Sequence, residues 1–248
     1  MKGRLTLAFF LAFSGNAAAV LDVGAVAGFD ARPPAQADPV FGLSIGIQLG
    51  PASLYSRGTI MATDAQDSTG DAYVDEWKRR YYSGDVTASV KIGAKEIAPV
   101  VGLSYRQSRF SDYDYEGGES GAGPKPLSYN DAKTTNRRIL AQGGVSLADE
   151  EITTLVWGGV GGALKKRTGL AWTQTPPPES KRTEWSLEAE WKTLEIAVGA
   201  VATYRVASHF GVAGGFEFSN RITTLNGEEP IDERPLGYTL FVAPTLHL

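Results

Sequence analysis

The stretch VFGLSIGIQLG, residues 40–50, decides the fold, because large apolar residues alternate strictly along it with mostly small or polar ones. The apolar positions are Phe41, Leu43, Ile45, Ile47 and Leu49. Successive side chains of a β-strand point to opposite faces, so this strand has one apolar face and one mostly small or polar face. Glycine and serine suit a crowded lumen better than a face in water. The pattern favours a closed barrel with its apolar side toward lipid.

The same alternation recurs along the chain, with no helical segment between the expected strands. We expect strands over residues 20–29, 40–50, 54–63, 82–92, 97–109, 134–147, 152–174, 181–206, 210–219 and 237–248. The connections alternate short and long, as in outer-membrane barrels with tight periplasmic turns and long outer loops. The long ones are residues 63–76, 110–133, 174–182 and 220–236. The expected fold is an all-β, closed antiparallel transmembrane β-barrel of about ten strands, with eight or twelve as alternatives.

The start of the chain predicts export. Lys2 and Arg4 precede the apolar residues 5–13, and small residues end at Ala19, which is the order of a secretory signal peptide. The apolar stretch is shorter than the roughly 20 residues that a membrane-spanning helix needs. We expect a signal peptide over residues 1–19, cleaved after Ala19, and an outer-membrane barrel domain over residues 20–248.

Composition excludes several kinds of chemistry. The chain has no cysteine, so it has no disulfide framework, thiolate metal site or thiol nucleophile. Without Lys2 and Arg4, the 24 basic residues become 22 against 28 acidic ones, a net charge of about −6. Nucleic acid is therefore an unsuitable partner.

One long stretch decides the strand count. Residues 152–174 and 181–206 flank three prolines, and each arm is about twice the 9 to 11 residues of a spanning strand. The apolar face of the second arm changes phase near residues 192–194, from Trp185 and Trp191 to Ile196. A β-bulge would produce this slip within one strand. A turn there is the alternative, but it gives an odd number of strands, so we expect the bulge.

In these features the chain resembles the small outer-membrane β-barrel proteins of Gram-negative bacteria, the group that includes opacity-type adhesins and porin-like barrels. The resemblance rests on the signal peptide, residues 40–50, TYRVASHFGVAGGFEFS (203–219) and YTLFVAPTLHL (238–248). It implies outer-membrane localisation, with outer-membrane lipid and the assembly machinery as partners. The chain departs from the group at Leu248, where an aromatic residue is usual, and at Pro244, which removes a ladder hydrogen bond.

The alternation also predicts which charges face the lumen. Five are positive and six are negative: Arg57, Lys91, Arg106, Arg138 and Arg205, against Asp22, Asp85, Glu188, Glu190, Glu195 and Glu217. Side chains fill much of a narrow barrel, so near-balanced charge favours an internal salt-bridge network. The alternative is a selectivity lining, although a pore more often carries an uncompensated ring of one sign.

Several other residues have side chains suited to binding or catalysis. Ser208 and His209 lie in a short turn and His247 lies next to the C-terminus, so we expect no catalytic residue. The acidic residues Asp64, Asp67, Asp71 and Asp75 match no defined calcium loop and favour a solvated outer loop. Tyr113 and Tyr115, among Asp112, Asp114 and Glu116, could form a binding tip. Interfacial girdle positions are expected for Tyr105, Trp185, Trp191, Tyr204 and Tyr238.

The sequence thus predicts an outer-membrane barrel with a structural or adhesin-like role through its outer loops, which could contact a surface ligand. A small porin or narrow channel for small solutes is the alternative, and a barrel enzyme acting on lipid is less favoured. We expect neither a cofactor nor a metal site.

Overall fold

The computed structural model describes residues 19–31, 38–67, 74–93, 95–120, 123–149, 151–175, 181–227 and 236–248. The predicted signal peptide lies outside these residues except for Ala19, which begins the first strand. Among the described residues there is no helix long and apolar enough to cross a membrane.

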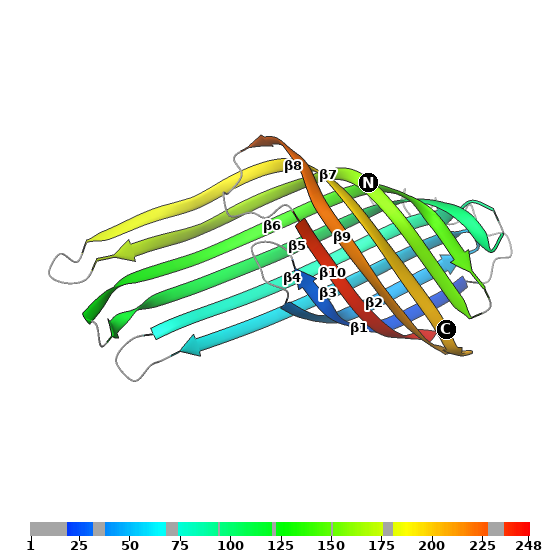
Figure 1. Ribbon diagram of the computed structural model, residues 1–248, viewed down its shortest axis with the longest axis horizontal. Helices are drawn as coiled ribbons and strands as arrows, with labels where there is room; N and C mark the ends of the chain where they lie inside the picture. Colours follow the sequence, from blue (N-terminus) through cyan, green and yellow to red (C-terminus); the bar gives the residue numbers. More distant parts are fainter. Residues whose placement is uncertain are drawn as a thin grey trace, which may run out of the picture.

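Ten antiparallel strands form a closed ring, which confirms the predicted fold class (Figure 1). Each strand pairs with its neighbours in sequence, and β1 pairs with β10 to close the ring. The strands are β1 (Ala19–Ala31), β2 (Asp38–Leu49), β3 (Ala52–Asp67), β4 (Val74–Lys91), β5 (Ile97–Ser120), β6 (Gly123–Ala148), β7 (Ile152–Gln174), β8 (Arg182–Ala207), β9 (Phe210–Gly227) and β10 (Leu236–His247).

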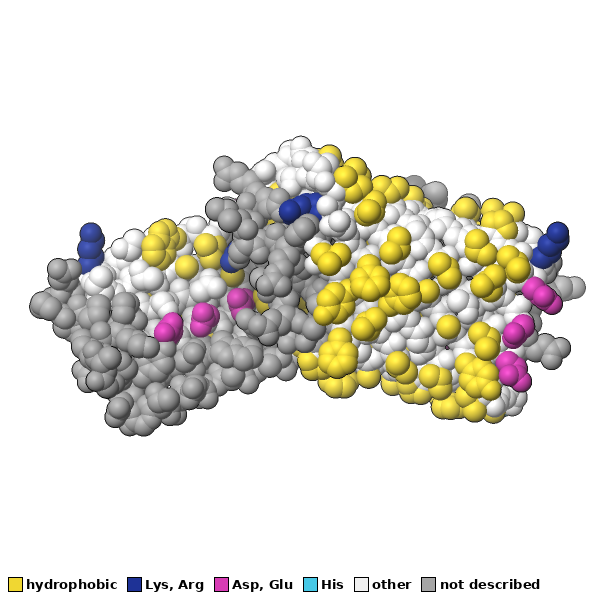
Figure 2. Space-filling view, in the orientation of Figure 1, with side chains coloured by type: hydrophobic (Ala, Val, Ile, Leu, Met, Phe, Trp, Pro, Cys, Tyr) yellow, Lys and Arg dark blue, Asp and Glu magenta, His cyan; other side chains and the backbone are white. Residues whose placement is uncertain are grey.

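An apolar belt surrounds the ring on its outer side. Phe41, Leu43 and Ile45 of the deciding stretch are 60%, 65% and 48% exposed, while Ser44 between them is 4% exposed. Figure 2 shows hydrophobic side chains spread over the ring, with charged side chains toward the two ends. Large apolar side chains point outward on every strand. They suit a lipid environment, because exposing so large an apolar surface to water is unfavourable.

Glycines lie on the inner face at positions where the backbone of the adjacent strand leaves no room for a Cβ atom. A Cβ atom on Gly42 would lie 1.9 Å from the carbonyl oxygen of Gly58. A Cβ atom on Gly161 would likewise lie 1.9 Å from the carbonyl oxygen of Ile139. On the outer face, by contrast, a Cβ atom on Gly84 would meet nothing within 4 Å. The glycines of the inner face thus permit the narrow, tightly curved ring.

The long strands β3–β8 continue beyond the ring as a curved sheet, on the left of Figure 1. We call this part the outer extension, made of the described parts of residues 61–81, 110–134 and 165–192. The prediction of long loops at 63–76 and 110–133 is wrong, because most of these residues pair in the hairpins β3–β4 and β5–β6. Residues 220–227 of the expected loop at 220–236 also belong to β9. The opposite end, with the connections around residues 50–51, 92–96, 149–151 and 208–209, is called the short-turn end.

The single long strand β8 is confirmed, but the predicted one-residue slip within it is wrong. Trp191, Thr193 and Glu195 are all buried, while Lys192 and Ile196 between and beyond them are exposed, so one face stays inside throughout. The apolar pattern inverts because the surroundings change. Inside the membrane the outer face meets lipid and is apolar, whereas beyond it the outer face meets water and is polar.

The irregularities lie in the partner strand. Pairing of β7 with β8 is continuous, but pairing of β8 with β9 shifts beside Lys192 and again beside Leu194. At each shift β9 carries one extra residue, Leu225 and Ile222 respectively, as a β-bulge requires.

The seam between β1 and β10 is interrupted. Its register runs from Asp22 to Gly24 and resumes at Ala27, opposite Thr245 and Val242. Pro244 lies in this gap and has no N–H to donate. At the end of the seam Leu248 exchanges two backbone hydrogen bonds with Leu21, at 2.8 and 3.1 Å.

Candidate functional site

A chain of charged side chains crosses the lumen, and we call it the ion-pair chain. Its members, in order of contact, are Arg57, Asp85, Arg106, Glu217 and Arg138. Arg57 Nε and Nη2 donate to Asp85 Oδ2 at 3.0 and 2.8 Å, and Arg106 Nη2 lies 3.5 Å from the same oxygen. Arg106 also donates two hydrogen bonds to Glu217, at 2.7 and 2.8 Å. Arg138 Nη2 donates to Oε1 of Glu217.

The contacts of Glu217 join opposite walls of the barrel. Glu217 is on β9, whereas Arg138 and Arg106 are on β6 and β5, three and four strands away around the ring. All five side chains of the ion-pair chain are at most 11% exposed. Three guanidinium groups face two carboxylates, so the chain carries one net positive charge. Removing one partner of such a buried set is costly, because it leaves a charge without compensation.

Apolar side chains lie next to the ion-pair chain on the side of the outer extension. Val40, Met61, Tyr81 and Phe110 form a buried cluster there, contributed by β2–β5. Toward β10, the guanidinium of Arg57 lies 4.6 Å from the ring centre of Phe241, within the range of a cation–π contact. The middle of the lumen is therefore packed with side chains.

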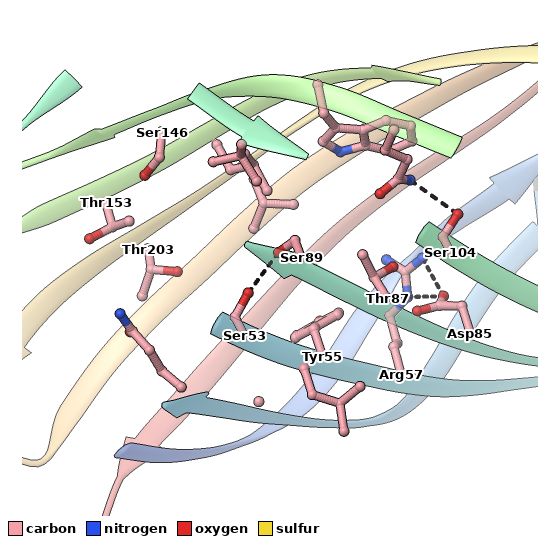
Figure 3. A pocket seen from close by; sticks show the side chains of 18 of the residues that line it. Ser53, Tyr55, Arg57, Asp85, Thr87, Ser89, Ser104, Ser146, Thr153 and Thr203 are labelled. Carbon is pink, nitrogen blue, oxygen red and sulfur yellow. Dashed lines mark hydrogen bonds and ion pairs between the residues drawn. The ribbon is translucent and has the colours of Figure 1, made fainter. Parts of the chain in front are cut away.

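Between the ion-pair chain and the short-turn end lies a cavity of about 290 Å³. Its wall is rich in hydroxyl groups, as Figure 3 shows. Ser53 and Ser89 share a hydrogen bond of 2.7 Å, and Gln142 Nε2 donates to Ser104 Oγ at 3.1 Å. Further hydroxyl groups on the wall belong to Tyr55, Thr87, Ser146, Thr153 and Thr203. Apolar side chains, among them Leu54, Trp157 and Phe241, form the rest of the wall. A lining of this mixed kind suits a small solute.

Most of the predicted luminal charges do face inward. Six of them are buried: Arg57, Asp85, Arg106, Arg138, Glu195 and Glu217. Asp22 and Lys91 are half-buried and line the cavity. The structure joins five of these eight residues in the ion-pair chain.

Three predicted luminal charges are misplaced. Glu188 and Glu190 lie on the outer face of the outer extension, and the Glu188 side chain is 75% exposed. The prediction failed there because it assigned the polar face of β8 to the lumen where that face meets water. Arg205 is exposed beside the β8–β9 turn, where the register shifts.

Sequence reasoning missed Lys165. This residue is 8% exposed, and its Nζ lies 3.2 Å from Oε1 of Glu195. Thr193 Oγ1 also donates to that oxygen, at 3.1 Å. Lys165 belongs to a run of three basic residues, 165–167, in which alternation by residue type is not visible. Continuing the phase of the large apolar residues Val156 and Val160 along the strand would have placed it inside.

The predicted girdle aromatics divide into two groups. Tyr105 and Tyr204 point outward and are 40% and 46% exposed, and half-buried Tyr238 shares their outer face. Trp191 is 1% exposed and points inward, so its girdle assignment is wrong. Trp185 has the same strand phase as Trp191 and lies in the outer extension, beyond the apolar belt.

The outer face of the outer extension carries three contacting rings, which we call the aromatic ladder: Tyr113, Tyr129 and Trp172. Tyr129 stacks on Trp172 with ring centres 5.5 Å apart, and Tyr113 meets Tyr129 edge-on at 5.6 Å. A cation lies over each end, Lys78 over Tyr113 at 5.4 Å and Arg182 over Trp172 at 4.4 Å. All three rings are half-exposed.

The sequence alone did not identify Tyr129 and Trp172 as members of the aromatic ladder. Tyr113 and Tyr115, predicted as part of a loop tip, both lie in β5. Asp112, Asp114 and Glu116 take the opposite face of that strand. Tyr129 and Trp172 were missed because the ladder forms only when β5, β6 and β7 pair.

The remaining candidates lie apart from the cavity. Ser208 and His209 occupy the exposed β8–β9 turn, and His247 ends β10. Of the acidic residues, Asp64 and Asp67 lie in β3 and Asp75 in β4, whereas Asp71 and all four side chains lie outside the described residues. Within the described part of the chain, no three His, Asp or Glu side chains are grouped to hold a metal ion.

Comparison with known proteins identifies the fold. No protein-family model and no curated protein matches the chain by sequence. The translocator domain of the autotransporter NalP from Neisseria meningitidis matches over 100% of this chain and 94% of its own, with 11% identity and a TM-score of 0.50. The outer membrane protease OmpT from Escherichia coli matches over 92% and 94%, with 9% identity and a TM-score of 0.45. Neisserial surface protein A matches over 94% and 98%, with 9% identity and a TM-score of 0.38.

The fold is thus that of the small outer-membrane β-barrels of Gram-negative bacteria. This fold supports outer-membrane localisation.

Proposed function

We propose that this protein acts at the outer face of the outer membrane, by binding a surface ligand or by strengthening the membrane, and that it is not an enzyme. The observation that carries the proposal is the outer extension. It holds the aromatic ladder half-exposed on its outer face, between Lys78 and Arg182. Aromatic and arginine side chains contribute most of the binding energy at many interfaces.

The proposal includes the partners and the processing of the chain. Outer-membrane lipid would surround the apolar belt, and the outer-membrane assembly machinery would insert the barrel. The signal peptide would be cleaved after Ala19. A nucleic-acid partner is not proposed, because acidic residues outnumber basic ones.

The test uses cells that display the barrel and immobilised matrix proteins and glycans as probes. Tyr129→Ser with Trp172→Ser removes the stacked pair and should lower binding about 30-fold or more, as expected for the loss of interface anchors. Thr135→Ala with Thr168→Ala, on the same face, is the matched control and should bind as the wild type does. Equal binding by all three proteins would leave membrane strengthening as the role.

The cavity favours a second candidate, a narrow channel. Its hydroxyl-rich wall could admit small polar solutes from the short-turn end. The ion-pair chain and the apolar cluster lie between it and the outer extension, so we expect no steady conductance in planar-bilayer recordings. A reproducible ion-selective current that changes with Arg106→Gln would instead establish a small porin.

A further inference from the structure

Basic side chains mark the outer edge of the apolar belt on five consecutive strands. Following the outer face of β4–β8 from the belt toward the outer extension, the first charged residue is always a Lys or an Arg. We call this row the basic belt, and it consists of Arg80, Arg109, Arg137, Lys166 and Lys192. Arg80 is half-buried and the other four are exposed.

Each member lies within two outward positions of the last residue that its strand contributes to the apolar belt. Arg80 follows Tyr82 at the next outward position, and Arg137 follows Ile139 in the same way. Tyr82 and Ile139 are 52% and 58% exposed, so they belong to the belt that meets lipid. The basic belt therefore lies at the height where acyl chains give way to headgroups.

The single sign of the basic belt is not a result of composition. The chain has 28 acidic and 24 basic residues, so mixed signs would be expected on five strands. On each strand the carboxylates of this face come only after the basic residue. On β8, Glu190 and Glu188 follow Lys192; Glu190 lies opposite Lys166 in the register, and the Glu188 side chain, 75% exposed, lies 4.0 Å from Lys166. Among the described residues no ion pair joins a carboxylate to Arg109, Arg137 or Lys192.

The opposite edge of the belt differs. At the short-turn end the exposed charges between strands have both signs: Lys95 and Glu96 after β4, and Asp149 and Glu151 after β6. Within the part of the chain that the structure describes, an excess of positive charge thus marks one edge of the membrane-facing surface, over β4–β8.

We propose that the basic belt binds the phosphate-bearing headgroups of outer-leaflet lipids whose acyl chains pack against the apolar belt. Arginine forms bidentate hydrogen bonds with phosphate, and basic residues at a membrane surface attract anionic headgroups. The neighbouring apolar belt supplies the second half of the site, which a soluble anion would not use. This inference deepens the proposed function, because it names the lipid chemistry that an outer-membrane barrel would meet at this edge.

The test uses the purified barrel in zwitterionic detergent micelles and phosphorylated lipid A as the probe. Arg109→Gln with Arg137→Gln neutralises two exposed members. Each lost charge should lower affinity about fivefold, and the pair about 25-fold. Arg109→Lys with Arg137→Lys keeps the charges and should retain most of the affinity. Lys95→Gln with Arg205→Gln, at the short-turn end, is the matched control and should bind as the wild type does.

Three further readouts make the outcome decisive. Affinity of the wild type should fall as ionic strength rises, and lipid A without phosphates should bind wild type and double variant equally. A phosphorylated headgroup without acyl chains should bind weakly. The proposal would be overturned if the Arg109→Gln, Arg137→Gln variant bound lipid A as tightly as the wild type does, or if the control variant lost as much affinity. It would also be overturned if the headgroup without acyl chains bound as tightly as lipid A. The circular-dichroism spectrum of each variant checks the barrel itself, and fractionation of cells tests outer-membrane placement separately.

Discussion

Glu217 compensates two buried arginines at once, one on β5 and one on β6. Glu217→Ala leaves both Arg106 and Arg138 without it, and we expect the free energy of unfolding to fall by about 3 to 5 kcal/mol. Urea unfolding in detergent, followed by tryptophan fluorescence, measures this. Glu188→Ala is the control, because its side chain is 75% exposed and should change stability by about 0.5 kcal/mol or less. Equal losses from both variants would contradict a buried network.

Asp149 sits in the turn between β6 and β7, outside the membrane. Its Oδ1 accepts hydrogen bonds from the backbone N–H groups of Ile152 and Glu151, at 2.7 and 2.8 Å. These bonds favour the carboxylate, so they lower the pKa of Asp149, the bond from Ile152 contributing most. At pH values above the ordinary aspartate pKa, these hydrogen bonds therefore stabilise the turn. Their contribution is lost as the pH falls through the lowered pKa of Asp149. A carboxyl NMR titration should give a pKa below that of an aspartate in a peptide, and an ordinary value would refute the turn geometry.

The inward charges were predictable wherever the outer face meets lipid. The strand alternation places Arg57, Asp85, Arg106, Arg138 and Glu217 inside. Glu217, for example, lies between outward Phe216 and Phe218. The same rule failed for Glu188 and Glu190, because beyond the membrane a polar residue belongs on the outside. Which charges then pair across the lumen depends on the ring and could not be predicted from the sequence.

At the scale of the strand, the inner glycines set how closely neighbours approach. Gly42→Ala places a Cβ atom 1.9 Å from the carbonyl oxygen of Gly58, so β2 or β3 must move. We expect a loss of about 1 to 3 kcal/mol in the free energy of unfolding. Gly84→Ala, on the outer face with nothing within 4 Å, should be neutral or stabilising by up to about 1 kcal/mol. Thermal unfolding in detergent compares the two, and a greater loss at Gly84 would contradict the assigned faces.

The ten strands were predictable from alternation, but the lengths of the outer ones were not. Residues 110–133 are rich in Gly, Asp and Tyr, a composition typical of loops. They form strands because Tyr113 and Tyr129 pack across β5 and β6, and because each backbone pairs with its neighbour. Strand formation here depends on cross-strand partners, which a single segment does not reveal.

For the whole molecule, the continuous apolar belt predicts where the protein is found. We expect the chain to sediment with the outer membrane and to stay folded in detergent, because its exterior buries apolar surface only in lipid or micelles. Separation of membrane fractions on a density gradient measures this. Recovery as a monomer in buffer without detergent would contradict it.

The seam between β1 and β10 has a consequence for how the ring moves. Pro244 leaves the ladder interrupted beside Ala25 and Val26, whereas the pairing of β6 with β7 runs without a gap. Amide protons exchange with deuterium when their hydrogen bonds open, and short or interrupted ladders open more easily than long ones. Deuterium uptake in detergent should therefore be faster in β1 and β10 than in the membrane-spanning parts of β6 and β7. The ring should open first along this one seam, between the two ends of the chain, while its other nine junctions remain paired.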